Sequence, residues 1–457
     1  STTTETVTVE DNVAPVALAQ DITVQLDVAG NVSIAASQID NGSNDACGIA
    51  SLSVVPGSFD CSNVGANTVT LTVTDNNGNV STATAVVTVE DNVAPVALTQ
   101  DITAQLDATG NVSITANQID NGSNDACGIA SLSVTPNSFN CANVGANAVT
   151  LTVTDVNGNV SSETAVVTVV DTVAPIAVAQ NLTVQLDATG SASITAAQID
   201  NGSSDNCGIA SLSVAPASFN CANVGANTVT LTVTDTNGNI STADAVVTVE
   251  DNVAPNALAN DITAQLDANG NVSITANQVD NGSNDACGIA SLSVAPSSFN
   301  CANVGANTVT LTVTDNNGNI STATSVVTVQ DSVLPVVLTQ NMTVQLDANG
   351  NAAILADGSG VNNGSSDNCG IASTNVIPNI FDCSDVGVNT VTLTVTDVNG
   401  NTNTGLAMVT VVDAVAPIAV AQNLTVQLDT TGNVSITAGD IDAGSSDNCG
   451  IASLSIS

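Results

Sequence analysis

The sequence predicts an all-β chain built as a tandem array of antiparallel β-sandwich domains. The first observation is a repeat, because the word DNVAP and its variants DTVAP, DSVLP and DAVAP return throughout the chain. These words begin at Asp11, Asp91, Asp171, Asp251, Asp331 and Asp413. The interval between them is constant as far as Asp331 and slightly longer after it. A period of this length fits a small domain with its own core, whereas the rungs of a solenoid are much shorter.

Alternating apolar residues within one repeat are the second observation, and they predict the strands. In Thr68–Asp75, TVTLTVTD, apolar residues alternate with threonines, and Ser81–Glu90 alternates after the tight turn DNNGN. Four further segments are predicted as strands: Ile22–Leu26, Val32–Ala36, Ile49–Val55 and Phe59–Val64. With a linker strand this makes about seven short strands, with turns roughly every 8–12 residues, which is typical of immunoglobulin-like domains. The one Phe of each repeat is expected in the core, and no segment has helical periodicity.

The repeat also sets the expected domain boundaries. Residues 1–10, STTTETVTVE, align with Ser81–Glu90, so we expect them to be the last strand of a preceding repeat. The expected domains are repeat 1 (11–90), repeat 2 (91–170), repeat 3 (171–250), repeat 4 (251–330), repeat 5 (331–412) and a truncated repeat 6 (413–457). The chain is therefore predicted to be a slice of a longer array.

The composition excludes several classes of function. The chain has a net charge of −42 and 43% hydrophobic residues, and it contains no Lys, Arg, His, Trp or Tyr. The apolar content distinguishes it from a disordered acidic tail. Without cationic side chains it cannot neutralise the phosphates of a nucleic acid, and an acidic membrane surface would repel it. Histidine- and lysine-based catalysis is impossible within these residues. No apolar run reaches the length of about 18 residues that a membrane span needs.

The eleven cysteines fall into pairs with one constant, short spacing, and we interpret each pair as a disulfide within one domain. The expected bonds are Cys47–Cys61, Cys127–Cys141, Cys207–Cys221, Cys287–Cys301 and Cys369–Cys383, with Cys449 bonded to a cysteine beyond Ser457. Closing such a loop contributes about 3 kcal/mol in the chain-entropy model, and disulfides place the chain outside the cytoplasm. The competing interpretation is a metal thiolate site, but two cysteines without histidine or a C-x-x-C spacing make a poor one.

Carboxylates are expected to gather where one domain meets the next. In an immunoglobulin-type sandwich the linker with Asp11, the loop with Asp40 and Asp45 and the turn that begins at Asp75 lie at the same end. Oxygen ligands in that number suit Ca²⁺, which takes six to eight oxygens. The predicted ligands are Asp11, Asp40, Asp45, Asp75, Asp91, Asp120, Asp125, Asp155, Asp171, Asp200, Asp205, Asp235, Asp251, Asp280, Asp285, Asp315, Asp331, Asp367 and Asp397.

Two simpler roles for these acids stay open. Asp75 and Asp27 begin turns, where Asp commonly bonds backbone amides, and Asp40 and Asp45 could only solvate their loop. The absence of any counter-charge favours a cation, because clustered carboxylates repel one another. Asp27 is expected to face the next junction. In repeat 5 the position of Asp40 is Asn362, beside a two-residue insertion, so a weakened site is expected there.

Two stretches of repeat 3, SSDNCGIAS and NVGANTVTLTVTDTNGNISTADAVVTVED, resemble the hyalin repeat, an immunoglobulin-like module. Near-identical acidic copies of this kind are similar to giant surface adhesins of gliding Bacteroidota, which the type IX system exports. The linker VEDNVAP resembles the calcium-binding linkers of cadherins, and this implies Asp11, Asn12 and their equivalents as junction ligands. The chain departs from the hyalin pattern because its second cysteine lies in the word FDC, Phe59–Cys61, and not in the final strand.

The leading functional hypothesis is an extracellular stalk or filament of a cell-surface adhesin, stiffened by calcium between neighbouring repeats of one long chain. The alternative is that the repeats themselves bind polysaccharide or a partner protein, although sugar sites usually use exposed aromatic residues. An enzyme that uses Asp40 and Asp45 as a carboxylate pair is the third hypothesis, which we reject because identical sites in every repeat lack a cleft-forming domain. The words DTV and DSV resemble an O-glycosylation signal of Bacteroidota, which predicts glycans on Thr172 and Ser332.

Overall fold

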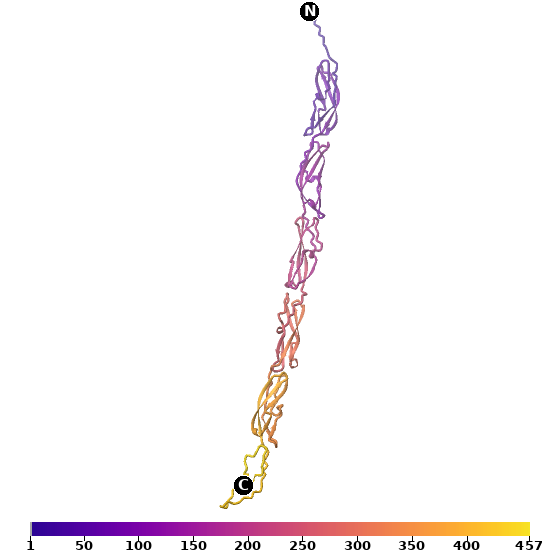
Figure 1. Ribbon diagram of the computed structural model, residues 1–457. Helices are drawn as coiled ribbons and strands as arrows, with labels where there is room; N and C mark the ends of the chain where they lie inside the picture. Colours follow the sequence, from indigo (N-terminus) through magenta and orange to yellow (C-terminus); the bar gives the residue numbers. More distant parts are fainter. Residues whose placement is uncertain (1) are drawn as a thin grey trace. The chain divides into compact units, whose positions relative to one another are not determined.

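The computed structural model describes residues 2–457, and its ribbon shows the same β-rich unit recurring along the chain (Figure 1). The main sheet of repeat 1 has four strands in the order β1–β6–β5–β3. Their bounds are β1 Ile22–Gln25, β3 Ile49–Val55, β5 Gly65–Asp75 and β6 Val80–Glu90. β5 and β6 form the antiparallel hairpin predicted from the alternating threonines, whereas β1 pairs with β6 in parallel.

A second, smaller sheet completes each repeat. In repeat 1 it pairs β2 (Asn31–Ser33) with β4 (Ser58–Asp60), and a single helical turn, α1 (Ala36–Ile39), follows β2. A 3-10 turn, η1 (Cys61–Asn63), follows β4. Periodicity does not predict α1 because four residues make only about one helical turn, which is too short for an amphipathic pattern. The prediction of Val32–Ala36 as a strand is therefore too long at its C-terminal end.

The same elements recur in the later repeats, with sheet orders β7–β12–β11–β9, β13–β18–β17–β15, β19–β24–β23–β21 and β25–β30–β29–β27. Repeat 2 contains β7 Ile102–Gln105, β8 Asn111–Ser113, α2 Ala116–Ile119, β9 Ile129–Thr135, β10 Ser138–Asn140, η2 Cys141–Asn143, β11 Gly145–Asp155 and β12 Val160–Val170. Repeat 3 contains β13 Leu182–Gln185, β14 Ser191–Ser193, α3 Ala196–Ile199, β15 Ile209–Ala215, β16 Ser218–Asn220, η3 Cys221–Asn223, β17 Gly225–Asp235 and β18 Ile240–Glu250.

Repeats 4 and 5 follow the same plan. Repeat 4 contains β19 Ile262–Gln265, β20 Asn271–Ser273, α4 Ala276–Val279, β21 Ile289–Ala295, β22 Ser298–Asn300, η4 Cys301–Asn303, β23 Gly305–Asp315 and β24 Ile320–Gln330. Repeat 5 contains β25 Met342–Gln345, β26 Asn351–Ala353, β27 Ile371–Ile377, β28 Ile380–Asp382, η5 Cys383–Asp385, β29 Gly387–Asp397 and β30 Thr402–Val412. Residues 413–457 contain the helical turn α5 (Ala438–Ile441).

Strand directions show that β3 and β4 form one run along the repeat. β3 is antiparallel to β5, which is antiparallel to β6, so β3 runs in the same direction as β6 and β1. The turn after β1 reverses the chain into β2, and β4 is antiparallel to β2. β4 therefore continues in the direction of β3, although it belongs to the other sheet. The residues between Cys47 and Cys61 thus cross the repeat from its linker end to its far end.

The two sheets enclose an apolar core, as the alternation predicts. In repeat 1, Val69, Leu71 and Val73 of β5 are completely buried, and Phe59 is 4% exposed. Ile39 of α1 is also completely buried and belongs to the same cluster. The repeats are therefore immunoglobulin-like β-sandwiches in tandem, and the prediction that the Phe of each repeat is a core residue is confirmed.

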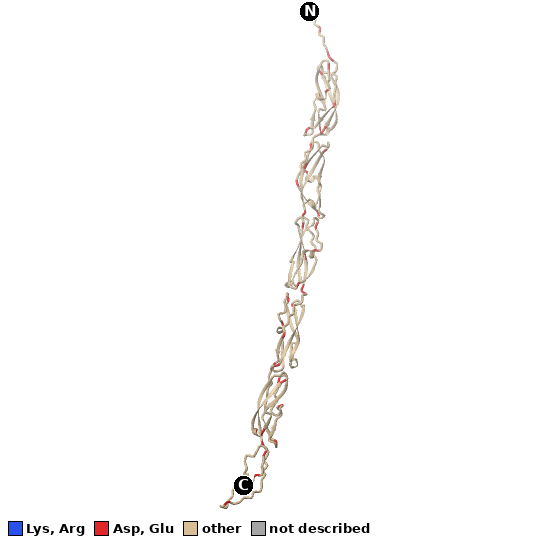
Figure 2. Ribbon diagram, viewed as in Figure 1, with Lys and Arg blue, Asp and Glu red and all other residues tan. Residues whose placement is uncertain are grey.

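The chain forms two compact units, and the division falls within repeat 3. The first unit contains the residues up to Val184, Ser193–Ser218 and Gly225–Thr248, and the second contains Gln185–Ala192, Phe219–Val224 and Val249–Ser457. Acidic residues are spread along both units, and no basic residue accompanies them (Figure 2). The negative charge therefore has no counter-charge anywhere in the chain.

Candidate metal centre at the repeat junctions

Each disulfide of the structure joins two consecutive repeats, so the predicted bonds within single repeats are wrong. The bonds are Cys61–Cys127, Cys141–Cys207, Cys221–Cys287, Cys301–Cys369 and Cys383–Cys449. Cys449 therefore has its partner inside the chain. Cys47 is the free cysteine of the described residues, and a hydrogen bond to the Asp11 carboxylate, together with its charge, raises the pKa of the Cys47 thiol.

The direction of β3 explains why the short spacing of Cys47 and Cys61 does not produce a bond. Cys47 precedes β3 at the linker end of the repeat, and Cys61 follows β4 at the far end. The seven residues of β3 alone cover about 23 Å. A disulfide needs Cα atoms within about 7 Å, so these two cysteines cannot reach each other. Cys61 instead meets Cys127 of the next repeat, with the Cα atoms 5.1 Å apart.

A glycine in the turn after the first strand of each repeat makes room for this bond. Gly110 has a φ of +76°, and a Cβ atom there would lie 2.7 Å from the Cys141 sulfur and 3.1 Å from the Asn206 carbonyl oxygen. Any side chain at Gly110 would therefore displace the disulfide. Cys141 and Cys207 both pack against the core of repeat 2, so the bond also covers the far end of that core.

The turn between the last two strands holds a buried carboxylate at the linker end of the repeat. In repeat 3 this is Asp235, which is 1% exposed. Its Oδ1 accepts hydrogen bonds from the backbone N–H groups of Asn237 and Asn239, and its Oδ2 accepts one from the Asn239 side chain. Burial raises the pKa of Asp235, but these hydrogen bonds outweigh it and hold the pKa below its usual value. The carboxylate therefore begins the turn and stays ionised.

Two further acids and an amide lie beside this turn, and they contain oxygens without a hydrogen-bond donor. Asp171 is 7% exposed, and its Oδ1 accepts from the backbone of Val173 while its Oδ2 is buried and unpaired. Oδ2 of Asp205 accepts from the backbone N–H of Cys207, and Oδ1 is buried and unpaired. Oδ1 of Asn206 is buried and unpaired as well. Three acceptor oxygens thus lack a donor at one junction.

The Asn206 side chain also reaches into the preceding repeat. Its Nδ2 donates to the backbone oxygen of Asp107, 3.0 Å away, and lies 3.4 Å from Oδ1 of Asp171. The Asp107 carboxylate is occupied by its own turn, where it accepts from Thr109 and Asn111. Asp107 is the counterpart of Asp27, and the turn that was expected to face the next junction does contact it, but through a carbonyl group and not through its carboxylate.

The structure brings carboxylates together at the linker end of each of the five complete repeats, in two kinds of set. One oxygen from each of Asp171, Asp205 and Asp235 lies within 4.8 Å of the others, and the same holds for Asp331, Asp367 and Asp397. The other sets combine two acids with a cysteine: Asp11, Asp45 and Cys47; Asp91, Asp125 and Cys127; Asp251, Asp285 and Cys287. Cys127 and Cys287 are disulfide-bonded, so they offer no thiolate.

The predicted ligands at the position of Asp40 do not join these sets. Oδ1 of Asp120 accepts from the backbone of Ser123, and Oδ2 accepts from Gly122, so the carboxylate is turned onto its own loop. Asp40, Asp200 and Asp280 accept from the corresponding serine. Asn362 of repeat 5 makes the same bond to Ser365, which means that its lack of charge leaves the cluster of repeat 5 unchanged. The reason given for a weakened site in repeat 5 is therefore wrong.

The linker residue that follows the first acid also points elsewhere. The Asn92 side chain, the counterpart of Asn12, donates to the side chains of Gln25 and Glu90, and Asn252 donates to Gln185. Thr172 and Ser332, the predicted glycosylation sites, occupy the same position and are exposed. Thr172 accepts a hydrogen bond from Gln105, and Ser332 donates one to Gln265.

We distinguish two kinds of junction by the residue that precedes the C-terminal cysteine of each disulfide. An asparagine junction has Asn206, Asn368 or Asn448 there, and an alanine junction has Ala126 or Ala286. In the second unit, Asn368 and Asn448 repeat the contacts of Asn206: each donates to a turn carbonyl of the preceding repeat, and each keeps a buried, unpaired Oδ1. At the alanine junctions the unpaired buried carboxylate oxygens of the described residues are Asp91 Oδ2 and Asp251 Oδ2.

The asparagine junction has the chemistry of a cation site. Two unit charges 4.8 Å apart repel by about 3 kcal/mol at an effective dielectric constant of about 20, and no basic side chain compensates. Buried acceptors without donors are destabilising as well, because they have lost their hydrogen bonds to water. A hard divalent cation satisfies both requirements, and carboxylate and amide oxygens are the ligands that Ca²⁺ prefers. The sequence analysis did not predict a role for Asn206, although the repeats differ visibly at this position, with NDACG in some and SDNCG in others.

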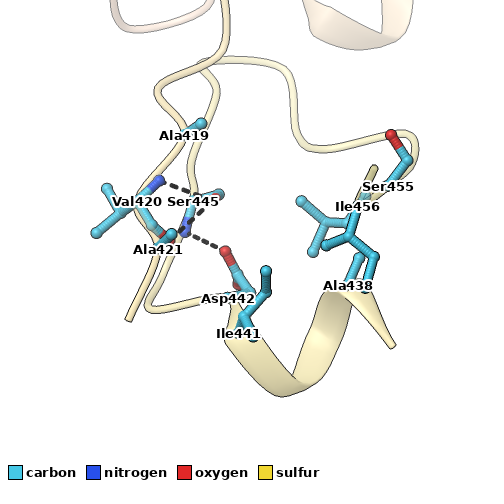
Figure 3. Close-up of a pocket in the computed structure, with 10 residues that line it drawn as sticks. Ala419, Val420, Ala421, Ala438, Ile441, Asp442, Ser445, Ser455 and Ile456 are labelled. Carbon is cyan, nitrogen blue, oxygen red and sulfur yellow. Dashed lines mark hydrogen bonds between the residues drawn. The ribbon is translucent and has the colours of Figure 1, made fainter. Parts of the chain in front are cut away.

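A small cavity in residues 413–457 is not a ligand site of this kind. It has a volume of about 110 Å³, and Figure 3 shows Ala438 and Ile441 of α5 facing the segment with Ile456. Ser445 closes one side, where it bonds Asp442 and Val420. Ile39, the counterpart of Ile441 in repeat 1, is completely buried by β5 and other strands. The cavity therefore corresponds to the sandwich core, which is open here.

Among the described residues there is no helix long and apolar enough to cross a membrane. No family model and no curated protein matches the chain. The chain is similar to solved structures of extracellular domain arrays, among them the extracellular domain of protocadherin gamma B4, with 14% identity, a TM-score of 0.27 and coverage of 80% of this chain and 74% of that chain. Drosophila N-cadherin EC1-4 is similar with 13% identity, a TM-score of 0.22 and coverage of 68% of this chain and 99% of that chain. The Sidekick-1 immunoglobulin domains 1–5 have 10% identity, a TM-score of 0.23 and coverage of 88% of this chain and 100% of that chain.

Proposed function

We propose that this chain is a spacer of an extracellular stalk, and that Ca²⁺ bound at the junctions fixes each repeat against the next. The observation that supports this most directly is the group of three buried oxygens without donors, on Asp171, Asp205 and Asn206. Asp235 would complete the site with a third carboxylate, and water would fill the remaining positions. The ion would supply only positive charge and no reaction.

Two observations favour a spacer over the other functions considered. All five Phe side chains, the only aromatic residues of the chain, are at most 4% exposed, so none is available to stack on a sugar. Asp40 and Asp45, the carboxylates of the rejected enzyme hypothesis, accept hydrogen bonds from Ser43 and Cys47 of their own loop. The proposal assigns no reaction to the chain.

The compartment and the family are part of the proposal. Five disulfides need an oxidising environment, which supports an extracellular location. The resemblance to hyalin repeats suggests a giant surface adhesin of a gliding bacterium, whose other domains would hold the surface or a polysaccharide. The partners of this segment itself are then the neighbouring repeats.

Thermal unfolding of the full chain in calcium and in chelator tests the proposal. A ligand that binds only the folded state stabilises it by about 2.7 kcal/mol at a hundredfold excess over Kd, so the Tm should rise with calcium concentration. Calorimetric titration should show binding at the junctions. The control variant Asp244→Asn removes a charge from an exposed position of β18, outside the cluster, and should keep the calcium response. Equal melting curves with calcium and with chelator would refute the proposal.

A further inference from the structure

We propose that the disulfides between repeats form a continuous covalent path that carries tension along the array and shields most of each repeat from it. From Cys61 the path crosses to Cys127, follows the backbone to Cys141 and crosses again to Cys207. It continues in the same way through Cys221–Cys287, Cys301–Cys369 and Cys383–Cys449. The two cysteines of a bridge are 66 positions apart in sequence, or 68 for Cys301 and Cys369, and the bridge bypasses the chain between them.

The backbone segments of this tension path are already extended in the folded repeat. In repeat 2 the segment between Cys127 and Cys141 consists mainly of β9 and β10, seven and three residues long. Since these strands run in the same direction, the segment crosses the repeat without doubling back. Pulling on its ends can therefore straighten it only slightly. The structure thus accounts for the position of the two cysteines, at opposite ends of one strand run.

The difference in reach is large. The segment from Cys127 to Cys141 extends to at most about 50 Å, whereas the backbone of a whole repeat extends to about 280 Å. A bridge adds only the Cα separation of the two cysteines, 5.3 Å for Cys141 and Cys207. An oxidised repeat can therefore lengthen by at most about 20 Å under tension, even if its hydrogen bonds break.

The bypassed loops contain the parts of the molecule that tension would otherwise separate. The loop between Cys141 and Cys207 includes the hairpin of β11 and β12, the linker and the carboxylates of Asp171 and Asp205. These elements lie in parallel with a covalent bond and not in series with the chain. The proposed calcium site would then set the geometry of a junction, while the disulfide limits its extension. This inference deepens the spacer function proposed above but needs no ion.

Single-molecule force spectroscopy of the full chain, pulled from its two ends, tests this path. Under oxidising conditions we expect one long step from the residues before Cys61, which no bridge bypasses, and no other lengthening step above about 20 Å. With a phosphine reductant, steps of roughly 230 Å should appear, about tenfold longer, because each whole repeat then extends. Cys47→Ser is the matched control and should change nothing, because Cys47 lies outside the path.

A second variant and a second measurement separate the possible outcomes. Cys141→Ser with Cys207→Ser should release one loop and add a single long step to the oxidised trace. Bonds within single repeats would instead give one oxidised step of roughly 190 Å for every complete repeat, and that result would overturn the proposal. Non-reducing peptide mapping must show the Cys141–Cys207 peptide pair, and a Cys127–Cys141 pair would overturn it too. The same oxidised limit is expected in chelator, so a failed calcium titration would leave this result unaffected.

Discussion

The junction between repeats 2 and 3 has the same fold as the junction between repeats 1 and 2, and each is crossed by its own disulfide. They differ in the residue before the C-terminal cysteine of that disulfide. At the asparagine junction, Asn206 bridges to the Asp107 carbonyl and adds its own buried oxygen to those of Asp171 and Asp205. At the alanine junction the same position is Ala126, whose methyl group packs near Gly30. The comparison shows that the disulfide is common to both kinds of junction, whereas the polar contact is specific to one.

The linker changes together with this side chain. The residue after the first acid is Asn92 or Asn252 at the alanine junctions, and Thr172 or Ser332 at two asparagine junctions. The two kinds alternate over the first four junctions, and the fifth, with Asn448 and Ala414, is again an asparagine junction. Two or three unpaired carboxylate and amide oxygens at the asparagine junctions, against one at the alanine junctions, predict that calcium binds more tightly at the asparagine junctions. The array would then respond to calcium in two stages.

The largest expected effect comes from removing the two carboxylates of an asparagine junction. Asp171→Asn with Asp205→Asn should weaken calcium binding at that junction by about a hundredfold, or about 2.7 kcal/mol, because both charged ligands are lost. In chelator the same variant should melt higher than the parent, because the like charges no longer repel. Calorimetric titration and thermal unfolding measure the two effects. A variant that is less stable in chelator would show that the carboxylates are structural acceptors.

The same exchange at the alanine junction is the matched comparison. Asp91→Asn with Asp125→Asn removes an equal charge from a pair that has no amide partner. Its effect on calcium binding should be several times smaller, since the parent junction offers fewer unpaired oxygens. Equal losses at both junctions would mean that the amide does not distinguish them.

Exchanging Asn206 and Ala126 should lower the calcium affinity of the Asn206 junction and raise that of the Ala126 junction. Asn206→Ala removes one oxygen ligand and the hydrogen bond to Asp107, so calcium affinity at that junction should fall by about tenfold. Ala126→Asn should raise affinity at the junction between repeats 1 and 2. Titrations of both variants and of the double exchange provide the measurement. If Ala126→Asn binds calcium no better than the parent, the amide oxygen is not a ligand.

The sequence predicts the sandwich better than the junction, and the reason is physical. Alternation in Thr68–Asp75 follows from burying one face of a strand, so β5 and its core residues could be predicted from local pattern alone. The pairing of Cys61 with Cys127 depends on where the ends of two different repeats meet, which no local pattern contains. Asp40 lies near Asp45 in sequence, yet the bond to Ser43 turns it away. Sequence proximity misleads where a strand separates two residues, as β3 separates Cys47 from Cys61, and where a bond within a loop turns one side chain away, as at Asp40.

Acid should affect the turn carboxylates of both kinds of junction in the same way, because Asp235 and Asp315 are both buried and accept corresponding hydrogen bonds. Burial raises the pKa of Asp235 and Asp315, but hydrogen bonds from Asn239 and Asn319 outweigh it and lower the pKa of both. The stability that these carboxylates contribute is complete above the unfolded pKa of about 3.9 and is lost as the pH falls through the lower folded pKa.

The variants Asp235→Asn and Asp315→Asn measure this contribution. In chelator at pH 7, each should lose on the order of 1 kcal/mol of unfolding free energy, and the gap to the parent should close towards pH 2. Thermal unfolding against pH records it. If the gap of Asp235→Asn stays constant down to pH 2, ionisation is not the source of the stability. A much larger loss for Asp235→Asn than for Asp315→Asn would show that the turns of the two junction types are not equivalent.

The smallest expected effect on stability concerns glycans, which are predicted at two of the asparagine junctions and at neither alanine junction. Thr172 and Ser332 are exposed and precede an aliphatic residue, whereas the alanine junctions have Asn at the same position. Peptide mass spectrometry of native material should find hexose on the peptides with Thr172 and Ser332, and none on the peptides with Asn92 and Asn252. Thr172→Val should abolish the hexose on the Thr172 peptide without changing the hexose on the Ser332 peptide. Because the hydroxyl bonds only an exposed glutamine, the Tm should change by less than about 2 °C. Unmodified Thr172 and Ser332 in native material would contradict this prediction, and the difference expected between the junctions would then rest on Asn206 alone.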